Sequence, residues 1–202
     1  KTGLVKEDTR LSFLGFGTMN GKDGKPFKTR EGGVMRLENL IADIDEEMFT
    51  KIVENRSVRD KDARDTAKIV GLAAIKYGDL SNQATKDYIF DVDRFTSFEG
   101  NTGPYILYTI VRIKSILNRY VEAGGNLEAG EILPASNGSE KNLMLQLSGF
   151  GSMIESAFEE KAPHKICAYI YEVSNAFNSF YHETKILSEE NQAQKESYIR
   201  LL

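Results

Sequence analysis

The spacing of apolar residues after residue 60 limits the possible folds more than any other feature of this chain. In four segments, apolar side chains recur every three or four positions, which places them along one face of a helix. These segments cover residues 60–78, 102–123, 143–158 and 163–181. The larger part of the chain is therefore expected to form a bundle of helices.

The ends of these segments contain residues that commonly begin or end helices. Asn101 or Thr102 is a good N-cap for the second helix, and Pro104 suits its first turn. Gly78 is expected to close the first helix. The stretch 124–139 is rich in glycine and is expected to be an irregular linker.

A different pattern precedes residue 60. Residues 11–17 are short, apolar and end in glycine, which predicts a strand that leads into a loop. Residues 45–55 predict a short acidic helix or connector. Residues 88–93 are too short and too rich in β-forming residues for a helix, so an extended segment is expected there. The predicted fold class is mainly α, with a small strand-and-loop part before the helices.

The loop after the predicted strand is the strongest candidate for a binding site. Five glycines and a proline between residues 17 and 33 frame four cations, Lys22, Lys25, Lys28 and Arg30. Backbone amides that glycine leaves accessible, next to several cations, suit a polyanion such as a nucleoside triphosphate. Most charged glycine-rich loops are solvated turns, so the composition of the loop leaves both interpretations open.

Composition narrows the class of protein. Hydrophobic residues make up 41% and charged residues 28%, which is typical of a folded soluble chain rather than a disordered one. No apolar run approaches the roughly 18 residues of a membrane span, so no membrane partner is expected. The net charge of −4 argues against a generally basic nucleic-acid-binding protein. One cysteine, Cys167, and no signal-peptide pattern point to the cytoplasm, with the thiol in the core.

Three further segments follow the loop: residues 75–82, 85–91 and 97–105. In order and spacing, the loop and these segments resemble bacterial-type arginyl-tRNA synthetase, a class I aminoacyl-tRNA synthetase. The resemblance extends from Gly15 to about Leu187. It implies an anticodon-binding helical bundle in residues 46–202, preceded in residues 1–45 by a short α/β remnant of a class I (Rossmann-type) catalytic domain.

Some features of the family are missing from the chain. Catalytic domains of this family open with a HIGH-type motif that grips ATP, and no such motif occurs here. The chain starts without Met and ends in the pattern of a beginning helix, residues 196–202. We therefore expect a C-terminal fragment, truncated in its last domain, that does not aminoacylate alone. We also expect residues 1–45 to be distorted, mobile or paired with another copy without the rest of their sheet.

The resemblance assigns roles to the loop. Residues 26–30 stand where the family carries its divergent KMSKS-type signature, which implies that Lys28, Thr29 and Arg30 are catalytic. Lys25, Lys28 and Arg30 are implied to bind ATP, whose leaving pyrophosphate needs electrostatic stabilisation. Thr29 stands in place of the second lysine of the usual signature, so the individual roles stay open. ATP is expected as a substrate, with Mg²⁺ in the full enzyme, and no cofactor is expected to bind this fragment tightly.

The resemblance also points to residues that could contact tRNA. Tyr181 falls where the helical domain of the family faces the anticodon, and an aromatic ring can stack on an unpaired base. It could equally continue the apolar face of its helix. Asn82 and Lys86 lie in a polar loop that is a plausible anticodon-loop contact by resemblance and a solvated turn by composition. Arg112, with other cations of the second helix, could contact phosphates or simply be solvated.

No metal site is expected. Asp87, Asp91 and Asp93 lack the spacing of a calcium loop, and His164 and His182 are poor zinc or general-base candidates. The expected partners are tRNA(Arg), with arginine and ATP in a full enzyme that is expected to be monomeric. Two other classes stay open: a free-standing RNA-binding module derived from such an enzyme, and a helical scaffold whose loop binds nothing.

Overall fold

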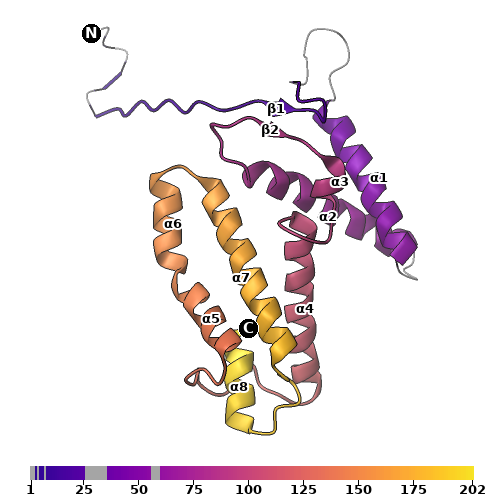
Figure 1. Cartoon of the computed structure of the whole chain (residues 1–202), viewed down its shortest axis with the longest axis vertical. Coiled ribbons are helices and arrows are strands. Elements are labelled where there is room, and N and C mark those ends of the chain that lie inside the picture. Colours follow the sequence, from indigo (N-terminus) through magenta and orange to yellow (C-terminus); the bar gives the residue numbers. More distant parts are fainter. Residues whose placement is uncertain (1–2, 4, 7, 26–35, 56–59) are drawn as a thin grey trace.

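The computed structural model describes residues 3, 5–6, 8–25, 36–55 and 60–202 (Figure 1). Over these residues the chain is mainly helical, as predicted, with only two short strands. The strands are β1 (Met19–Asn20) and β2 (Tyr88–Ile89). The helices are α1 (Leu37–Asn55), α2 (Asp60–Leu80), α3 (Val92–Phe95), α4 (Gly103–Glu122), α5 (Gly138–Ser148), α6 (Phe150–Glu159), α7 (Pro163–Glu183) and α8 (Gln192–Leu201).

The first cluster of buried apolar residues lies between α1 and α2, which run side by side (Figure 1). Leu40, Ile44 and Met48 of α1 are spaced four residues apart and therefore share one face of that helix. Phe90 and Phe95 complete the cluster, with their rings edge to face at a centroid distance of 4.8 Å. The aromatic pair therefore fastens the segment after β2 onto the helix pair.

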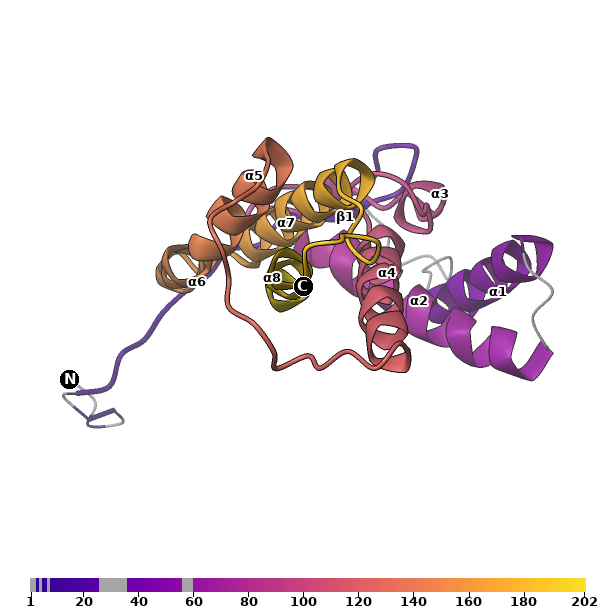
Figure 2. The ribbon, with the colours of Figure 1, turned by 90° about the horizontal axis from the view of Figure 1, so that it is seen from below.

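A second, separate cluster lies among α4, α5, α7 and α8. Ile116 and Tyr120 of α4 face Phe177 and Phe180 of α7, and α8 adds Tyr198. Figure 2 shows α8 lying beside α7, with the long linker passing from α4 around to α5. A hydrogen bond joins this linker to α8: the Leu133 backbone N–H donates to the Ser197 hydroxyl at 2.9 Å.

The two clusters are joined where α2 meets α4 and α7. At Gly103 the backbone of α4 approaches that of α2 so closely that a Cβ would lie 2.3 Å from the carbonyl oxygen of Ala73. The Tyr77 hydroxyl lies 2.7 Å from the carbonyl oxygen of Cys167 in α7. The predicted division between residues 45 and 46 falls inside α1, so the position of the functional boundary stays a prediction.

The predicted strand over residues 11–17 is wrong. These residues form no strand and leave the side chains of Leu11, Phe13 and Phe16 largely exposed. Figure 2 shows the segment extending away from the helices. The strand is instead β1, which pairs in parallel with β2, Met19 opposite Tyr88. A strand needs a partner to satisfy its backbone groups, and among the described residues before α1 it is those of β1 that pair with one.

Several helix boundaries also differ from the prediction. The acidic helix α1 begins at Leu37 rather than near residue 45, and α8 begins at Gln192. The single helix predicted over residues 143–158 is divided at Gly149 into α5 and α6. Gly78 does not end α2, which continues to Leu80. This glycine instead makes room for the ring of Phe95, which an added Cβ would approach to 2.6 Å.

The start of α4 confirms the sequence prediction. Thr102 is the N-cap, its hydroxyl accepts a hydrogen bond from the Tyr105 backbone N–H at 3.2 Å, and Pro104 lies in the first turn. The predicted extended segment 88–93 is confirmed only in part. It forms β2 and then turns into α3, for which the Asp91 carboxylate is the N-cap.

Gly17 docks the segment before β1 onto the loop before β2, and we expect Gly17→Ala to release it. The Gly17 N–H donates to the carbonyl oxygen of Ala84 at 2.8 Å, and an added Cβ would lie 2.2 Å from the backbone carbon of Lys86. Backbone atoms cannot rotate away, so the pairing should open. Amide exchange at Tyr88, whose N–H donates to the Thr18 carbonyl, should become at least about tenfold faster.

The matched control for this change is Gly15→Ala. At Gly15 an added Cβ would meet only the Phe13 ring at 3.8 Å, which is an ordinary contact. Exchange at Tyr88 should therefore stay unchanged in Gly15→Ala. Equal protection of Tyr88 in both variants would show that β1 does not depend on the close approach at Gly17.

Candidate RNA-binding surface and nucleotide loop

The structure describes only the first part of the glycine-rich loop. Residues 21–25 form a turn in which the Gly21 N–H donates to the Lys25 carbonyl at 3.0 Å and the Lys25 N–H donates to Asp23 Oδ1 at 3.1 Å. The Lys25 side chain is exposed. Lys28, Thr29 and Arg30 lie outside the described residues, so Lys25 alone represents the predicted ATP-binding set.

Lys22, another cation of this loop, forms ion pairs with two aspartates of the same chain. Its Nζ lies 2.5 Å from Asp93 Oδ2 and 3.2 Å from Asp91 Oδ1. The hydrogen bond from Lys22 holds the pKa of the Asp93 carboxyl below its ordinary value, and the same contacts raise the pKa of Lys22. Lys22 therefore connects the loop to α3, a pairing that no local pattern of residues predicted.

Asp87, the third carboxylate considered for a metal, has a different partner. Its Oδ1 accepts a hydrogen bond from the Thr18 backbone N–H at 2.7 Å, and this bond lowers the pKa of Asp87. The three aspartates thus hold β1, α3 and the loop together. Among the residues that the structure describes, no group of three or more His, Cys, Asp or Glu side chains could hold a metal ion.

The loop between α2 and β2 holds two of the predicted tRNA contacts. The Asn82 side-chain amide donates to the Gly78 carbonyl at 2.5 Å, so it caps the end of α2. The Lys86 side chain is exposed. Asn82 therefore stabilises the end of α2, whereas the Lys86 side chain is accessible to solvent.

Tyr181 lies at the edge of the second cluster rather than inside it. Its side chain is 38% exposed, whereas Phe177 and Phe180 on the same helix are buried. The ring packs against Phe177 at a centroid distance of 6.1 Å with an interplanar angle of 29°. An exposed, partly supported aromatic ring of this kind is available for stacking on an unpaired base.

The structure brings an arginine from α4 to this ring, a contact that sequence reasoning missed. Arg112 Cζ lies 5.0 Å from the Tyr181 ring centroid and 4.7 Å from that of Tyr108. Tyr108 and Arg112 are one helical turn apart, so their proximity could have been predicted. Their meeting with Tyr181 depends on how α4 packs against α7, for which the sequence carries no local signal.

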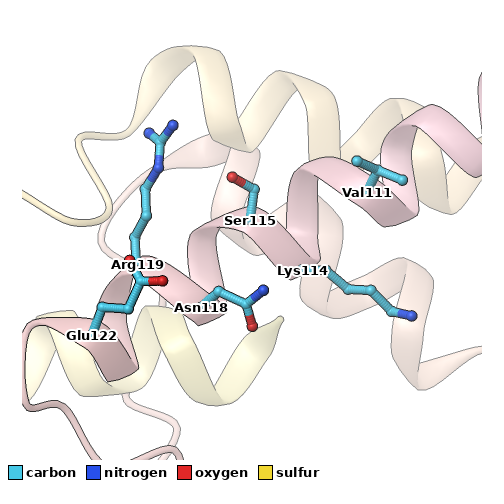
Figure 3. A pocket seen from close by; sticks show the side chains of 6 residues that line it. All are labelled: Val111, Lys114, Ser115, Asn118, Arg119 and Glu122. Atoms are coloured by element: carbon cyan, nitrogen blue, oxygen red, sulfur yellow. The ribbon is translucent and has the colours of Figure 1, made fainter. Parts of the chain in front are cut away.

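A shallow hollow lies further along α4 (Figure 3). Its lining residues are Val111, Lys114, Ser115, Asn118, Arg119 and Glu122. In Figure 3 the side chains of Ser115 and Arg119 lie on one side of the helix, and those of Lys114 and Asn118 on the other. The two cations therefore do not converge on one anion, as expected for a solvated helix face.

The predicted tRNA contacts fall in two separate places. Tyr77, near the end of α2, touches Cys167 in the first turns of α7, so the loop with Asn82 and Lys86 lies toward that end of α7. Tyr181 is 14 residues further along α7, which at 1.5 Å per residue is roughly 21 Å. Figure 1 shows the same separation between the region of β2 and the lower end of α7.

None of the helices in the described part of the chain has the length and apolar character required to cross a bilayer.

Comparisons with known proteins find relatives over the whole chain. The family model of the class I tRNA synthetase (R) catalytic domain matches residues 1–92, and that of the DALR anticodon binding domain matches residues 106–202. An arginine–tRNA ligase from Agathobacter rectalis is 66% identical, covering 100% of this chain and 35% of the ligase. One from Alkaliphilus oremlandii is 55% identical, covering 100% of this chain and 34% of the ligase. The chain thus spans about a third of the length of these curated relatives.

Solved structures share the fold. The arginyl-tRNA synthetase of Thermus thermophilus has a TM-score of 0.79 at 23% identity, covering 93% of this chain and 31% of that one. The enzyme from Plasmodium falciparum has a TM-score of 0.71 at 26% identity, covering 83% of this chain and 30% of that one. The backbone arrangement of this chain therefore has known counterparts.

Proposed function

The chain belongs to the arginine–tRNA ligase family, as its motifs predicted, and on this premise we propose that it is part of an enzyme that activates arginine with ATP and attaches it to tRNA(Arg). The observation that carries the proposal is the 66% identity to a curated arginine–tRNA ligase over the whole of this chain. Because the chain spans about a third of such a ligase, aminoacylation is assigned to the whole enzyme, not to this chain alone.

The glycine-rich loop supplies the ATP site in this proposal. Lys28, Thr29 and Arg30 are the catalytic residues, and Lys25 joins Lys28 and Arg30 in binding the triphosphate. Cations next to the leaving pyrophosphate stabilise the charge that develops when the arginine carboxylate attacks the α-phosphate. Lys22 is excluded from this role because Asp91 and Asp93 already hold it.

The helical part supplies tRNA recognition. Tyr181 stacks on a base of the anticodon loop, and Lys86, with Asn82 beside it, contacts the RNA at a second place. The match of residues 106–202 to an anticodon-binding domain supports the first contact. The functional division, with the ATP site in residues 1–45 and tRNA recognition in residues 46–202, belongs to the same proposal.

The remaining assignments concern the whole enzyme. Arginine and ATP are its small substrates, it works in the cytoplasm, and it is a monomer. Mg²⁺ enters with ATP, whose phosphates are its usual ligands.

Binding of this chain to arginine tRNA transcripts tests the proposal directly. The affinities for a transcript with the natural anticodon and one with altered anticodon bases are compared at two salt concentrations. We expect tighter binding of the natural transcript at both concentrations, since phosphate contacts depend on salt but carry no sequence information. Equal affinities for the two transcripts would contradict recognition of the anticodon by this chain. No binding of either transcript would contradict tRNA binding by this chain.

Replacing the stacking ring should weaken tRNA binding. We expect Tyr181→Ala to cost about 1–3 kcal/mol of binding free energy, the range for a lost base stack. Tyr181→Phe is the matched control, because it keeps the ring and removes only the hydroxyl, and its affinity should stay near that of the unchanged chain. Tyr181→Ala binding as tightly as Tyr181→Phe would rule out the stacking role.

A further inference from the structure

Arg112 of α4 contacts α7 at and near Tyr181. Its Cζ lies 4.7 Å from the centroid of the Tyr108 ring and 5.0 Å from that of the Tyr181 ring, so one guanidinium contacts both aromatic faces. Its Nη1 donates to Asn178 Oδ1 at 2.5 Å. Arg112 therefore meets α7 at two points, a ring and an amide, that lie one helical turn apart.

The amide that holds Arg112 is itself fixed. Asn178 Nδ2 lies 2.9 Å from the Tyr105 hydroxyl and 3.3 Å from Thr109 Oγ1, both of α4. The Tyr105 hydroxyl in turn donates to Asn175 Oδ1 at 2.8 Å. With its donor engaged by α4, the Asn178 amide can present only its oxygen to Arg112. The position of the guanidinium is thus set by a network between the helices.

We propose that Arg112 is a positioning residue, which holds the Tyr181 ring in the orientation that stacks on an unpaired RNA base. This inference rests on the proposed function. A ring that is 38% exposed would otherwise exchange between rotamers, and ordering it on binding would cost affinity. The Arg112 cation over the ring and the Phe177 ring packed against it reduce that cost before RNA arrives.

The planar shape of the guanidinium is essential to this role. A guanidinium can lie against two rings and still donate in its own plane, whereas a lysine ammonium is a compact point charge that cannot do both. Arg112→Lys therefore keeps the charge and removes the positioning. If Arg112 acted only by neutralising a phosphate, lysine would replace it with little loss.

The test measures binding of the chain to two arginine tRNA transcripts, one with the natural anticodon and one with altered anticodon bases. The readout is the ratio of the two affinities, together with the salt dependence of each. Arg112→Lys, Tyr181→Ala and the double variant are compared. The matched control is Arg64→Lys, which removes a guanidinium that lies 4.0 Å from the Phe49 ring centroid in the α1–α2 pair.

We expect Arg112→Lys to lower the affinity ratio by about tenfold, equivalent to ~1.4 kcal/mol, with an unchanged salt dependence. In the Tyr181→Ala background the same change should have no further effect, because the ring that it positions is gone. Arg64→Lys should leave the ratio unchanged, and thermal unfolding should show that each variant is folded.

Three results would overturn the inference. If Tyr181→Ala lowers the ratio and Arg112→Lys does not, the positioning role is wrong while the proposed stacking stands. Additive losses in the double variant would show that Arg112 acts without Tyr181. A ratio that Tyr181→Ala leaves unchanged would remove the proposed stacking itself, and the positioning role with it.

Discussion

Phe180→Ala is expected to lower the free energy of unfolding by about 3–5 kcal/mol, the usual cost of removing a buried phenylalanine ring. Phe180 is 0% exposed and meets the Tyr198 ring edge to face at a centroid distance of 5.4 Å. The change removes the contact through which α7 holds α8 and leaves a cavity that both helices border. Such a loss is a large part of the stability of an ordinary domain.

Urea unfolding followed by helical circular dichroism measures this effect. The matched control is Phe158→Ala, which removes the same kind of ring from a side chain that is 84% exposed. Its free energy of unfolding should change by less than about 0.5 kcal/mol. If the two variants unfold at the same midpoint, the second cluster does not stabilise the helices as described.

Gly103→Ala is expected to cost about 3 kcal/mol or more, because the added Cβ would lie 2.3 Å from the carbonyl oxygen and 2.5 Å from the carbonyl carbon of Ala73. Both atoms belong to the backbone of α2, so no side-chain rotation can relieve the contact. The two helices must move apart, which loosens the junction of α2 and α4 between the two core clusters.

The same unfolding measurement tests Gly103→Ala, with Gly151→Ala in α6 as its matched control. At Gly151 nothing lies within 4 Å of an added Cβ, so alanine should be neutral or slightly stabilising through its higher helix propensity. Unchanged stability of Gly103→Ala would mean that the joint between α2 and α4 can shift at no cost.

Parts of the candidate site could be predicted from the sequence and parts could not. The family resemblance singled out Tyr181 as a candidate for base stacking, which stays a prediction, and the structure leaves its ring partly exposed. The Arg112 contact could not be predicted, because it joins residues of α4 and α7 that are far apart in the chain. The same holds for Lys22, whose pairing with Asp93 brings the loop to α3.

The wrongly predicted strand and the divided helix both show what a local pattern leaves open. Residues 11–17 are apolar like a strand, but β-structure requires a neighbouring strand, and in the part of the chain that the structure describes it is Met19 and Asn20 that pair with β2. Residues 143–158 keep a helical spacing across Gly149, yet the helix is interrupted there. Periodicity records which residues can share a face, and it does not record where the backbone changes direction.

Local chemistry was enough to predict that the chain is mainly helical, where α4 begins and how far α7 extends, because an N-cap, a first-turn proline and a 3.6-residue period act within a few residues of each other. Tertiary structure alone decided that Gly103 lies against Ala73 and that Arg112 meets Tyr181. These contacts arise from the packing of whole helices, whose crossing depends on all the side chains between them.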